Sequence, residues 1–344
     1  MLQRGLEKAI QSRLNHQKVT LLLGARRLGK TALLDRITQN TYKKILRLHG
    51  EDMDTRKLLD NRTIANYKKL LQGYDLLMID EAQYIVDIGR KLKLMIDEIS
   101  PLHIIITASL ALDISKSDEP LAGRTITYYL YPFAQNEFAQ QESVFETKQK
   151  LEERMIFGSY PEVVFLKTKE EKARYLLELA NTYLFKDILA FENIRNPQKL
   201  KDLLKLIGMQ IGSEVSLDEL GKNLGMSKNT VERYLDLLSK VFVIYQRKGF
   251  SKNLRKEIVK SNRWYFYDNG IRNSICGNLQ PFALRQDTHM LWENYFLSER
   301  MKCNSINEKQ LESYFWRTYD QQEIDLIELE NEEITAFACK WKLH

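Results

Sequence analysis

Cysteine is scarce in this sequence, and long apolar runs are missing. The three cysteines, Cys276, Cys303 and Cys339, lie far apart and form no Cys-x-x-Cys pair. Neither a disulfide framework nor a zinc site fits that spacing, which favours a reducing compartment. No apolar run approaches the ~20 residues that a membrane span needs. The first residues mix charged and apolar side chains, unlike a signal peptide. These absences predict a cytoplasmic protein with no membrane partner.

The composition is otherwise that of an ordinary globular protein. The 344 residues are 44% hydrophobic and 28% charged, and a chain of this length is expected to form about two or three domains. The formal net charge of +6 is mild. Basic side chains are nevertheless concentrated in residues 240–263, where Glu257 is the one acid. That local excess indicates a polyanionic partner.

The pattern of apolar residues divides the chain into four parts. Residues 1–136 alternate helical patterns with short apolar runs typical of strands buried on both faces, at 19–23, 45–49, 76–80 and 103–107. This alternation predicts an α/β fold with a parallel sheet. Residues 137–206 are largely helical in pattern. Residues 207–275 contain a helical pair and the basic segment, and residues 276–344 contain one helix and three strand-like runs.

The stretch GARRLGKT follows the first expected strand and opens a helical pattern. Its spacing, Gly-x-x-x-x-Gly-Lys-Thr, is that of a phosphate-binding loop. The glycines let backbone N–H groups face phosphate oxygens, Lys30 neutralises charge, and the Thr31 hydroxyl reaches Mg²⁺. The side chains of Arg26 and Arg27 are expected to point outward, toward a lid, a neighbouring subunit or a ligand edge. The residues expected around the phosphates of ATP are Gly24, Ala25, Arg26, Arg27, Leu28, Gly29, Lys30, Thr31 and Ala32.

A second motif favours a phosphate-binding loop at residues 24–31 over an ordinary basic turn before a helix. The apolar run at residues 76–80 ends in Asp80, and Glu81 follows it. We expect Asp80 to hold Mg²⁺ together with Thr31, and Glu81 to polarise the water that attacks the γ-phosphate. Acidic residues after a strand are also common as helix caps, so this assignment depends on its pairing with the loop. Glu81 and Lys30 are thus the expected catalytic residues.

Three further residues each have two interpretations. Thr107 and Ser109 end the fourth apolar run, where a polar side chain can contact the γ-phosphate or the attacking water, or simply end a strand. Arg124 could stabilise charge on the transferring phosphate, in its own subunit or a neighbour's. An ordinary surface arginine is the alternative. An oligomer is compatible with the sequence, but no pattern specifies one.

Motifs spread along most of the chain are GARRLGKT, LRLHGED, IDEAQYI, ITAS with LAGR, PFAQNEF, FGSYPEVV, YLFKDIL, LGMSKNTVERYLDLLSKVFVIY and YFYDNGIRNSI. Together they resemble the prokaryotic predicted AAA+ ATPases that carry a C-terminal nuclease-like domain. The resemblance implies a P-loop ATPase core (1–136), a helical lid (137–206), a winged helix (207–275) and a truncated restriction-endonuclease-like domain (276–344). One small departure is Ala108, where the family more often has glycine.

Residues 216–238 can be interpreted without the family. Two amphipathic helices flank a turn at Gly225, and Ser227 is placed to cap the second helix. In such pairs the start of the second helix enters the DNA major groove, and a basic wing contacts phosphates. Double-stranded DNA is therefore a predicted partner, with packing between domains as the alternative. The candidate DNA-binding residues are Lys228, Asn229, Thr230 and Arg233 in the helix, and Lys252, Arg255 and Lys256 in the wing.

The resemblance implies a metal-dependent nuclease site that the sequence supplies only in part. Glu293, Asp325 and Lys340 stand where the family has functional residues, but Ala338 stands where a glutamate is expected. A missing acidic ligand weakens Mg²⁺ binding. The sequence also ends before the helix and strand that would close the sheet, so we expect an exposed edge strand. We therefore expect no cleavage of nucleic acid, and surface charges on a docking domain are the plain alternative for these residues.

The expected function is Mg²⁺-dependent binding and hydrolysis of ATP, coupled to domain rearrangement. Three uses of that hydrolysis remain open. The chain could be an ATPase that acts on DNA, a signalling switch whose winged helix only packs between domains, or an ATP-regulated nuclease. Stimulation of ATP turnover by duplex DNA separates the first from the second.

Overall fold

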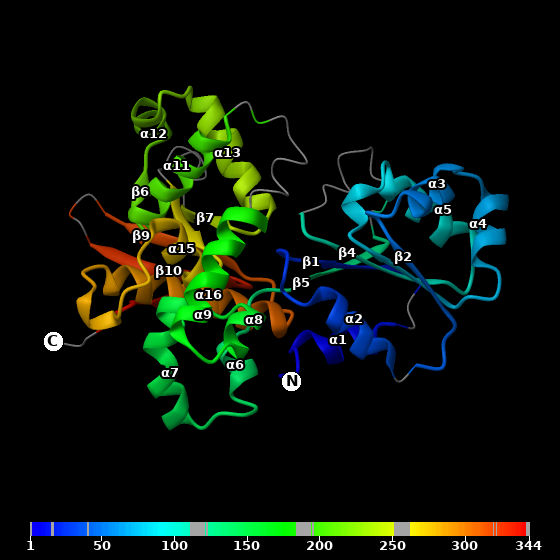
Figure 1. The fold of residues 1–344 in the computed structure, drawn as a ribbon, viewed down its shortest axis with the longest axis horizontal. Helices are drawn as coiled ribbons and strands as arrows, with labels where there is room; N and C mark the ends of the chain where they lie inside the picture. Colours follow the sequence, from blue (N-terminus) through cyan, green and yellow to red (C-terminus); the bar gives the residue numbers. More distant parts are fainter. Residues whose placement is uncertain are drawn as a thin grey trace. The chain divides into compact units, whose positions relative to one another are not determined.

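The computed structural model describes residues 2–14, 17–39, 41–110, 121, 123–183, 194, 196–250, 262–318, 320 and 322–341. The chain forms two compact units. Unit 1 runs from Gln3 to Tyr131, and unit 2 runs from Pro132 onward and includes Leu2. In Figure 1 the chain changes colour from blue in unit 1 to red at the end of unit 2.

A parallel sheet of five strands forms the centre of unit 1. The strands lie in the order β2-β3-β4-β1-β5, and every neighbouring pair is parallel. Three expected strands have the predicted bounds, and the fourth extends one residue further. The predicted α/β fold with a parallel sheet is therefore confirmed. The strands are β1 (Val19–Leu23), β2 (Ile45–His49), β3 (Leu76–Asp80), β4 (His103–Ala108) and β5 (Thr125–Tyr129).

Helices cover both faces of this sheet, with α1 and α2 on one side and α3, α4 and α5 on the other (Figure 1). The chain leaves β1 toward one edge of the sheet and leaves its neighbour β4 toward the other. In open α/β sheets, ligands bind outside the carboxyl ends of strands where the direction reverses in this way. The helices are α1 (Leu6–Ser12), α2 (Lys30–Gln39), α3 (Met53–Asp60), α4 (Ile64–Leu71), the 3₁₀ turn η1 (Ala82–Tyr84) and α5 (Ile88–Glu98).

Unit 2 contains one mixed sheet of six strands in the order β11-β10-β9-β7-β8-β6. All pairs are antiparallel except β7 with β9, which is parallel. The sheet therefore joins strands from before and after residue 276. As expected, the last strand lies at an edge and is exposed. The strands are β6 (Glu214–Val215), β7 (Ile244–Gly249), β8 (Asn262–Phe266), β9 (Glu312–Arg317), β10 (Glu323–Glu330) and β11 (Glu333–Phe337).

In unit 2, α11, α12 and α13 lie at one end, α6 and α7 lie at the other, and α9, α15 and α16 lie between them (Figure 1). Side-chain caps fix several of their starts, because hydroxyl oxygens accept bonds from the first free N–H groups. Ser143 accepts from the backbone of Glu146, and Thr168 accepts from that of Glu171. The helices are α6 (Gln135–Phe138), α7 (Val144–Phe157), α8 (Pro161–Phe165), α9 (Lys169–Glu178), the π-helix η3 (Leu179–Tyr183), α11 (Pro197–Met209), α12 (Leu217–Leu224), α13 (Lys228–Lys240), α15 (Asn269–Cys276), the 3₁₀ turn η4 (Phe282–Leu284) and α16 (Thr288–Ile306).

The core of unit 2 is tied together by buried polar side chains at the start of α15. Asp268 accepts bonds from the backbone N–H groups of Ser159 (2.7 Å) and Ile271 (3.1 Å). Asn273 donates to two carbonyl oxygens near the end of α7. A Cβ at Gly158 would lie 2.0 Å from Oδ1 of Asp268, so a side chain there would exclude this carboxylate. Two of the motifs, FGSYPEVV and YFYDNGIRNSI, thus meet in a buried polar junction.

Among the described residues, no helix combines the length and the apolar character that crossing a membrane would require.

Candidate functional site

The loop between β1 and α2 closes around the side chain of Lys30. A Cβ at Gly24 would lie 2.2 Å from the carbonyl oxygen of Leu130, so only glycine fits there. Gly29 has a φ of 81°, a conformation that glycine adopts without strain. Lys30 Nζ donates to the carbonyl oxygens of Gly24 (2.8 Å) and Ala25 (3.0 Å). The loop is therefore already curled, with the lysine charge at its centre.

The two residues expected at the metal lie against each other. Thr31 Oγ1 donates to Asp80 Oδ2 at 2.6 Å, and Thr107 Oγ1 donates to the other carboxylate oxygen. Hydroxyl and carboxylate oxygens are the ligands that Mg²⁺ prefers, and Mg²⁺ retains water for its other positions. The residues present therefore fit this ion, with Thr31 and Asp80 as the donors. Thr107 supports Asp80 rather than ending a strand without a contact.

Glu81 is held in place from both its backbone and its side chain. Its φ is 51°, in the left-handed region that few non-glycine residues adopt. Its N–H donates to Asp80 Oδ1 and Thr107 Oγ1, both at 3.1 Å. Ser109 Oγ donates to Glu81 Oε2 at 3.0 Å, and Gln83 donates to the same oxygen. The orientation of the Glu81 carboxylate is therefore fixed by groups of the protein itself.

Two cations of the phosphate loop flank the Glu81 carboxylate. Lys30 Nζ lies 3.9 Å from Oε1, and Arg26 Nη2 lies 4.0 Å from Oε2. Arg26 also donates to Glu51 Oε1 (3.0 Å) and to the Tyr84 hydroxyl (2.6 Å). The bond from Arg26 lowers the pKa of Glu51 below its usual value. The expected outward orientation of Arg26 is therefore wrong, because these partners draw it into the site, whereas Arg27 is exposed.

Arg124 lies at the amino ends of the strands, whereas the phosphate loop lies at their carboxyl ends. It precedes β5, and its carbonyl oxygen accepts a bond from the N–H of Val19, at the start of β1. Gly24 follows the other end of that five-residue strand, about 16 Å away. Arg124 instead pairs with Asp97 at 2.6 Å. The hypothesis that it reaches the phosphate of its own subunit is corrected by this position, while a neighbouring subunit's phosphate remains a prediction.

The candidate DNA-binding residues of α13 lie at its start. Ser227 caps the helix by accepting from the N–H of Thr230 at 3.2 Å. Lys228, Asn229 and Arg233 are exposed, and Thr230 is half-buried. Lys228 Nζ lies 3.6 Å from Asp218 Oδ2 on α12. The wing residues Lys252, Arg255 and Lys256 lie outside the residues that the structure describes.

The nuclease-like residues lie partly in the interior of unit 2. Burial raises the pKa of Glu293 to about 7, and Tyr265 donates to its Oε1 at 2.7 Å. Burial also raises the pKa of Asp325, which accepts from the N–H of Cys339 at 2.5 Å. Asp325 is 7% exposed, so the interpretation as a surface charge does not hold for it. Lys340 is exposed.

Of the carboxylates that the resemblance implies for a nuclease metal, this chain supplies Glu293 and Asp325. Among the described residues, no group of three or more His, Cys, Asp or Glu side chains is arranged to hold a metal ion. Ala338 brings no oxygen where the resemblance implies a carboxylate. Arg263, which lies near Glu293, donates to Glu323 Oε2 at 2.7 Å. The buried guanidinium of Arg263 thus already balances part of the negative charge of these carboxylates.

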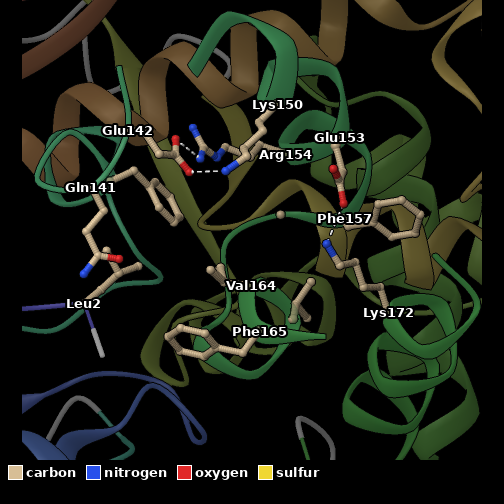
Figure 2. A pocket seen from close by; sticks show the side chains of 13 residues that line it. Leu2, Gln141, Glu142, Lys150, Glu153, Arg154, Phe157, Val164, Phe165 and Lys172 are labelled. Carbon is tan, nitrogen blue, oxygen red and sulfur yellow. Dashed lines mark hydrogen bonds and ion pairs between the residues drawn. The ribbon is translucent and has the colours of Figure 1, made fainter. Parts of the chain in front are cut away.

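A cavity of about 270 Å³ lies among the first helices of unit 2 (Figure 2). Apolar side chains such as Phe165 line one side. The charged side chains on its rim are paired with one another. Glu142 bonds Lys150 at 2.9 Å, and Glu153 bonds Lys172 across the opening. The cavity thus differs from the phosphate loop, where the charge of Lys30 lies among backbone carbonyl oxygens.

Comparison with known families gives three matches to successive segments of the chain. Residues 16–139 match the model of a family described as AAA domain. Residues 148–281 and 289–344 match two families described as domains of unknown function, DUF8612 and DUF4143. Together with the loop and the sheet order, the first match shows that unit 1 has the fold of AAA-type P-loop ATPases. The other two matches name neither a winged helix nor a nuclease.

Individual relatives extend over most of the chain. An uncharacterized protein of Mycobacterium tuberculosis is 25% identical over 319 residues, which is 91% of this chain and 68% of the relative. Another, from Methanocaldococcus jannaschii, is 24% identical over 327 residues, which is 86% of this chain and 73% of the relative. A solved structure titled the Walker-type ATPase of Pyrococcus abyssi is similar with a TM-score of 0.51 and 16% identity, over 80% of this chain and 96% of that one. At that identity the likeness concerns the fold.

Three partners of Arg26 and Glu81 were missed by sequence reasoning. Glu51, Gln83 and Tyr84 all follow strands β2 or β3 closely, within the quoted stretches LRLHGED and IDEAQYI. Because the carboxyl ends of parallel strands share one edge of a sheet, their position was the available signal. The residue spacing within the phosphate loop does not indicate these three residues, because they lie outside that loop.

Proposed function

We propose that this chain binds ATP together with Mg²⁺ and hydrolyses it at the carboxyl edge of the unit 1 sheet. The observation that supports this most directly is the convergence of three motifs that are far apart in the sequence. Lys30 and Thr31 open α2, Asp80 ends β3 with Glu81 directly after it, and Thr107 lies in β4. Hydrogen bonds of 2.6 to 3.1 Å join Thr31 to Asp80 and Thr107 to the backbone of Glu81.

Each residue has one role in this proposal. The loop N–H groups and Lys30 hold the phosphates, and Thr31 and Asp80 hold Mg²⁺, which when bound neutralises charge on the phosphate oxygens. Glu81 accepts a proton from the attacking water, and Ser109 keeps its carboxylate oriented. Release of ADP and phosphate changes the charge in the loop. We propose that this change drives the domain rearrangement.

Two variants separate the role of Lys30 in nucleotide binding from the role of Glu81 in turnover. Lys30→Ala should abolish tight nucleotide binding, because it removes the cation that faces the phosphates. Glu81→Gln should bind ATP normally and lose turnover by a factor on the order of 100, because an amide is a poor proton acceptor. Fluorescent-nucleotide titration and phosphate release are the two measurements. Glu98→Gln, an exposed residue at the end of α5, is the matched control. Wild-type turnover by Glu81→Gln would show that another group is the base.

We further propose that the hydrolysis serves interaction with double-stranded DNA. The supporting observation is the exposed polar start of α13, which follows α12 after a tight turn at Gly225. In this proposal residues 1–136 are the ATPase core, 137–206 a helical lid, 207–275 a winged helix and 276–344 a nuclease-like domain, in a cytoplasmic protein. The alternative is a switch in which the helix pair only packs.

Duplex DNA separates these two possibilities. Binding should fall steeply with salt, because each phosphate contact releases counterions. The double variant Lys228→Glu with Arg233→Glu should lose about tenfold or more in affinity. Lys148→Glu with Lys167→Glu makes the same change in charge on exposed residues elsewhere in unit 2 and should have little effect. Equal affinities for the two double variants, with no stimulation of ATP turnover by DNA, would favour the packing role.

A further inference from the structure

The phosphate loop carries a second cation, Arg26, whose position is fixed from outside the loop. Its Nη2 contacts Glu51, just after β2, and the hydroxyl of Tyr84 in η1. The Arg26 side chain is 17% exposed. A long side chain that is anchored twice has already lost most of its rotamer freedom, so little more is lost when it meets a ligand.

The same guanidinium lies beside the group proposed as the base. Arg26 Nη2 is 4.0 Å from Glu81 Oε2. A general base must lie within about 3 Å of the water that it deprotonates, and that water must in turn contact the γ-phosphorus. A cation next to Glu81 is therefore about one water molecule away from the transferring phosphoryl group. Arg124, at the far end of β1, has no such position in this unit.

We propose that Arg26 is a catalytic residue, which stabilises the charge that develops on the γ-phosphoryl group within its own subunit. This inference rests on the proposed ATPase function. In the step, the water oxygen forms a bond to the γ-phosphorus, and the bond from that phosphorus to the β–γ bridging oxygen breaks. Glu81 takes the proton from water, and ADP and phosphate are the products. Arg26 donates to the equatorial oxygens, where the negative charge is spread.

Glu51 and Tyr84 act in this proposal as positioning residues. They place the guanidinium at the site before ATP arrives, and a preorganised donor needs no rearrangement during the reaction. Lys30 Nζ and Arg26 Nη2 lie 3.9 and 4.0 Å from the carboxylate oxygens of Glu81. A triphosphate in the loop competes for both cations, which leaves Glu81 available to the attacking water.

The test compares turnover with ground-state binding in the full chain. Arg26→Gln should lower kcat by a factor on the order of 10³, the effect of a charge-stabilising arginine in other phosphoryl-transfer enzymes. KM for ATP and the Kd for ADP should change by less than about threefold, because the interaction is strong only in the transition state. Tyr84→Phe should give a smaller fall in kcat. Arg90→Gln, an exposed arginine of α5, is the control and should turn over normally.

A transition-state analogue gives a second readout. ADP with aluminium fluoride should bind the wild type much more tightly than ADP alone, and Arg26→Gln should lose that gain while it keeps ADP binding. Retained ADP binding also shows that the variant is folded. Wild-type kcat in Arg26→Gln would overturn the inference and leave the ATPase function intact. An equal loss of ADP affinity would assign Arg26 to ground-state binding and overturn it as well. A wild type that binds but does not hydrolyse ATP would overturn both proposals.

Discussion

Gly50, just after β2, lies with its backbone close to the carbonyl groups of Asp80 and Glu81. The N–H of Gly50 donates to the carbonyl oxygen of Asp80 at 2.7 Å. A Cβ at Gly50 would lie 2.2 Å from the carbonyl oxygen of Glu81 and 3.4 Å from that of Asp80. The stretch LRLHGED thus supports the acidic pair through its backbone, at a place where a side chain of any size must displace that pair.

Gly50→Ala should therefore lower kcat by about tenfold or more, because Asp80 and Glu81 must move together. ADP affinity measured without Mg²⁺ should change little, since the phosphate loop is not displaced. Gly73→Ala is the matched control: its φ of 81° makes alanine unfavourable, but no atom lies within 4 Å of the new Cβ. It should cost about 1 kcal/mol of stability and leave turnover unchanged. Equal turnover in the two variants would contradict this account.

Glu293 makes the stability of unit 2 depend on pH. Burial raises its pKa from the ordinary value of 4.5 to about 7. Below 4.5 the carboxyl group is protonated in both the folded and the unfolded chain. Between 4.5 and about 7 the unfolded chain loses its proton first, so the free energy of unfolding falls as pH rises. The pKa of Asp325 is also raised by burial, which acts in the same direction.

Glu293→Gln should remove about 3 kcal/mol of this pH dependence. The measurement is urea unfolding of the wild type and the variant at several values between pH 4.5 and pH 8, the interval that brackets the raised pKa. Glu178→Gln, on the exposed side of α9, is the control. Curves for Glu293→Gln and the wild type that stay parallel over this interval would show that Glu293 titrates normally.

At the scale of elements, the hairpin of β10 and β11 carries strain in its turn. Glu330 pairs with Glu333, so Asn331 and Glu332 form a two-residue loop, and their φ angles are 48° and 75°. Such a turn favours Asn followed by Gly, because glycine adopts positive φ without a steric cost. Glu332 also adds a third carboxylate to that closing pair. The turn therefore combines backbone strain with like-charge repulsion.

Glu332→Gly should raise the free energy of unfolding of unit 2 by about 0.5–1 kcal/mol. Glu332→Gln removes the charge and keeps the strained φ, so it separates charge repulsion from backbone strain. We expect it to give the smaller part of the gain in free energy of unfolding. Chemical denaturation monitored by tryptophan fluorescence provides the measurement. A decrease in stability for Glu332→Gly would mean that the greater freedom of glycine in the unfolded chain outweighs the strain.

The elements of unit 1 were predictable because burial imposes a simple pattern on them. Strands β1, β3 and β4 are buried along nearly their whole length, and only continuous apolar runs meet that requirement. The pairing of β7 with β9 was not predictable in this way. It joins residues that lie 66 positions apart, Lys248 and Tyr314, and no local pattern specifies so distant a partner.

The candidate site shows the same contrast. Lys30, Thr31, Asp80 and Glu81 were assigned from motif spacing, because the strand–loop–helix geometry fixes what such spacing can place together. The position of Arg26 depends on where β2 and η1 deliver Glu51 and Tyr84. The location of Arg124 depends on the register of β5 against β1. Both follow from the order of strands across the sheet, which the sequence alone leaves open.

For the whole molecule, the decisive feature of unit 2 is its single sheet. The segments that match two separate families, residues 148–281 and 289–344, contribute β7 and β9 as neighbouring strands. Arg263 on β8 and Glu323 on β10 form an ion pair of 2.7 Å across the same sheet. The proposed winged helix and the proposed nuclease-like domain therefore share one hydrogen-bonded sheet.

This shared core bears on whether the chain cuts nucleic acid. A metal-dependent nuclease needs carboxylates that are free to bind Mg²⁺ and to activate water. Here Asp325 accepts a bond from the backbone of Cys339, Glu293 accepts one from Tyr265, and Ala338 supplies no oxygen. The raised pKa of Glu293 further reduces its negative charge near neutral pH. Both carboxyl groups are thus engaged by hydrogen bonds within unit 2, which argues against their use in cleavage.

The chain should therefore leave supercoiled plasmid intact in the presence of ATP with Mg²⁺ or Mn²⁺. Gel electrophoresis after prolonged incubation is the measurement, and Asp325→Asn is the control that separates intrinsic cleavage from a contaminating nuclease. Nicking by the wild type that Asp325→Asn abolishes would contradict the prediction and restore the ATP-regulated nuclease as a candidate. Nicking of equal extent in both proteins would identify a contaminant, because Asp325 is the carboxylate that any site of this kind must use.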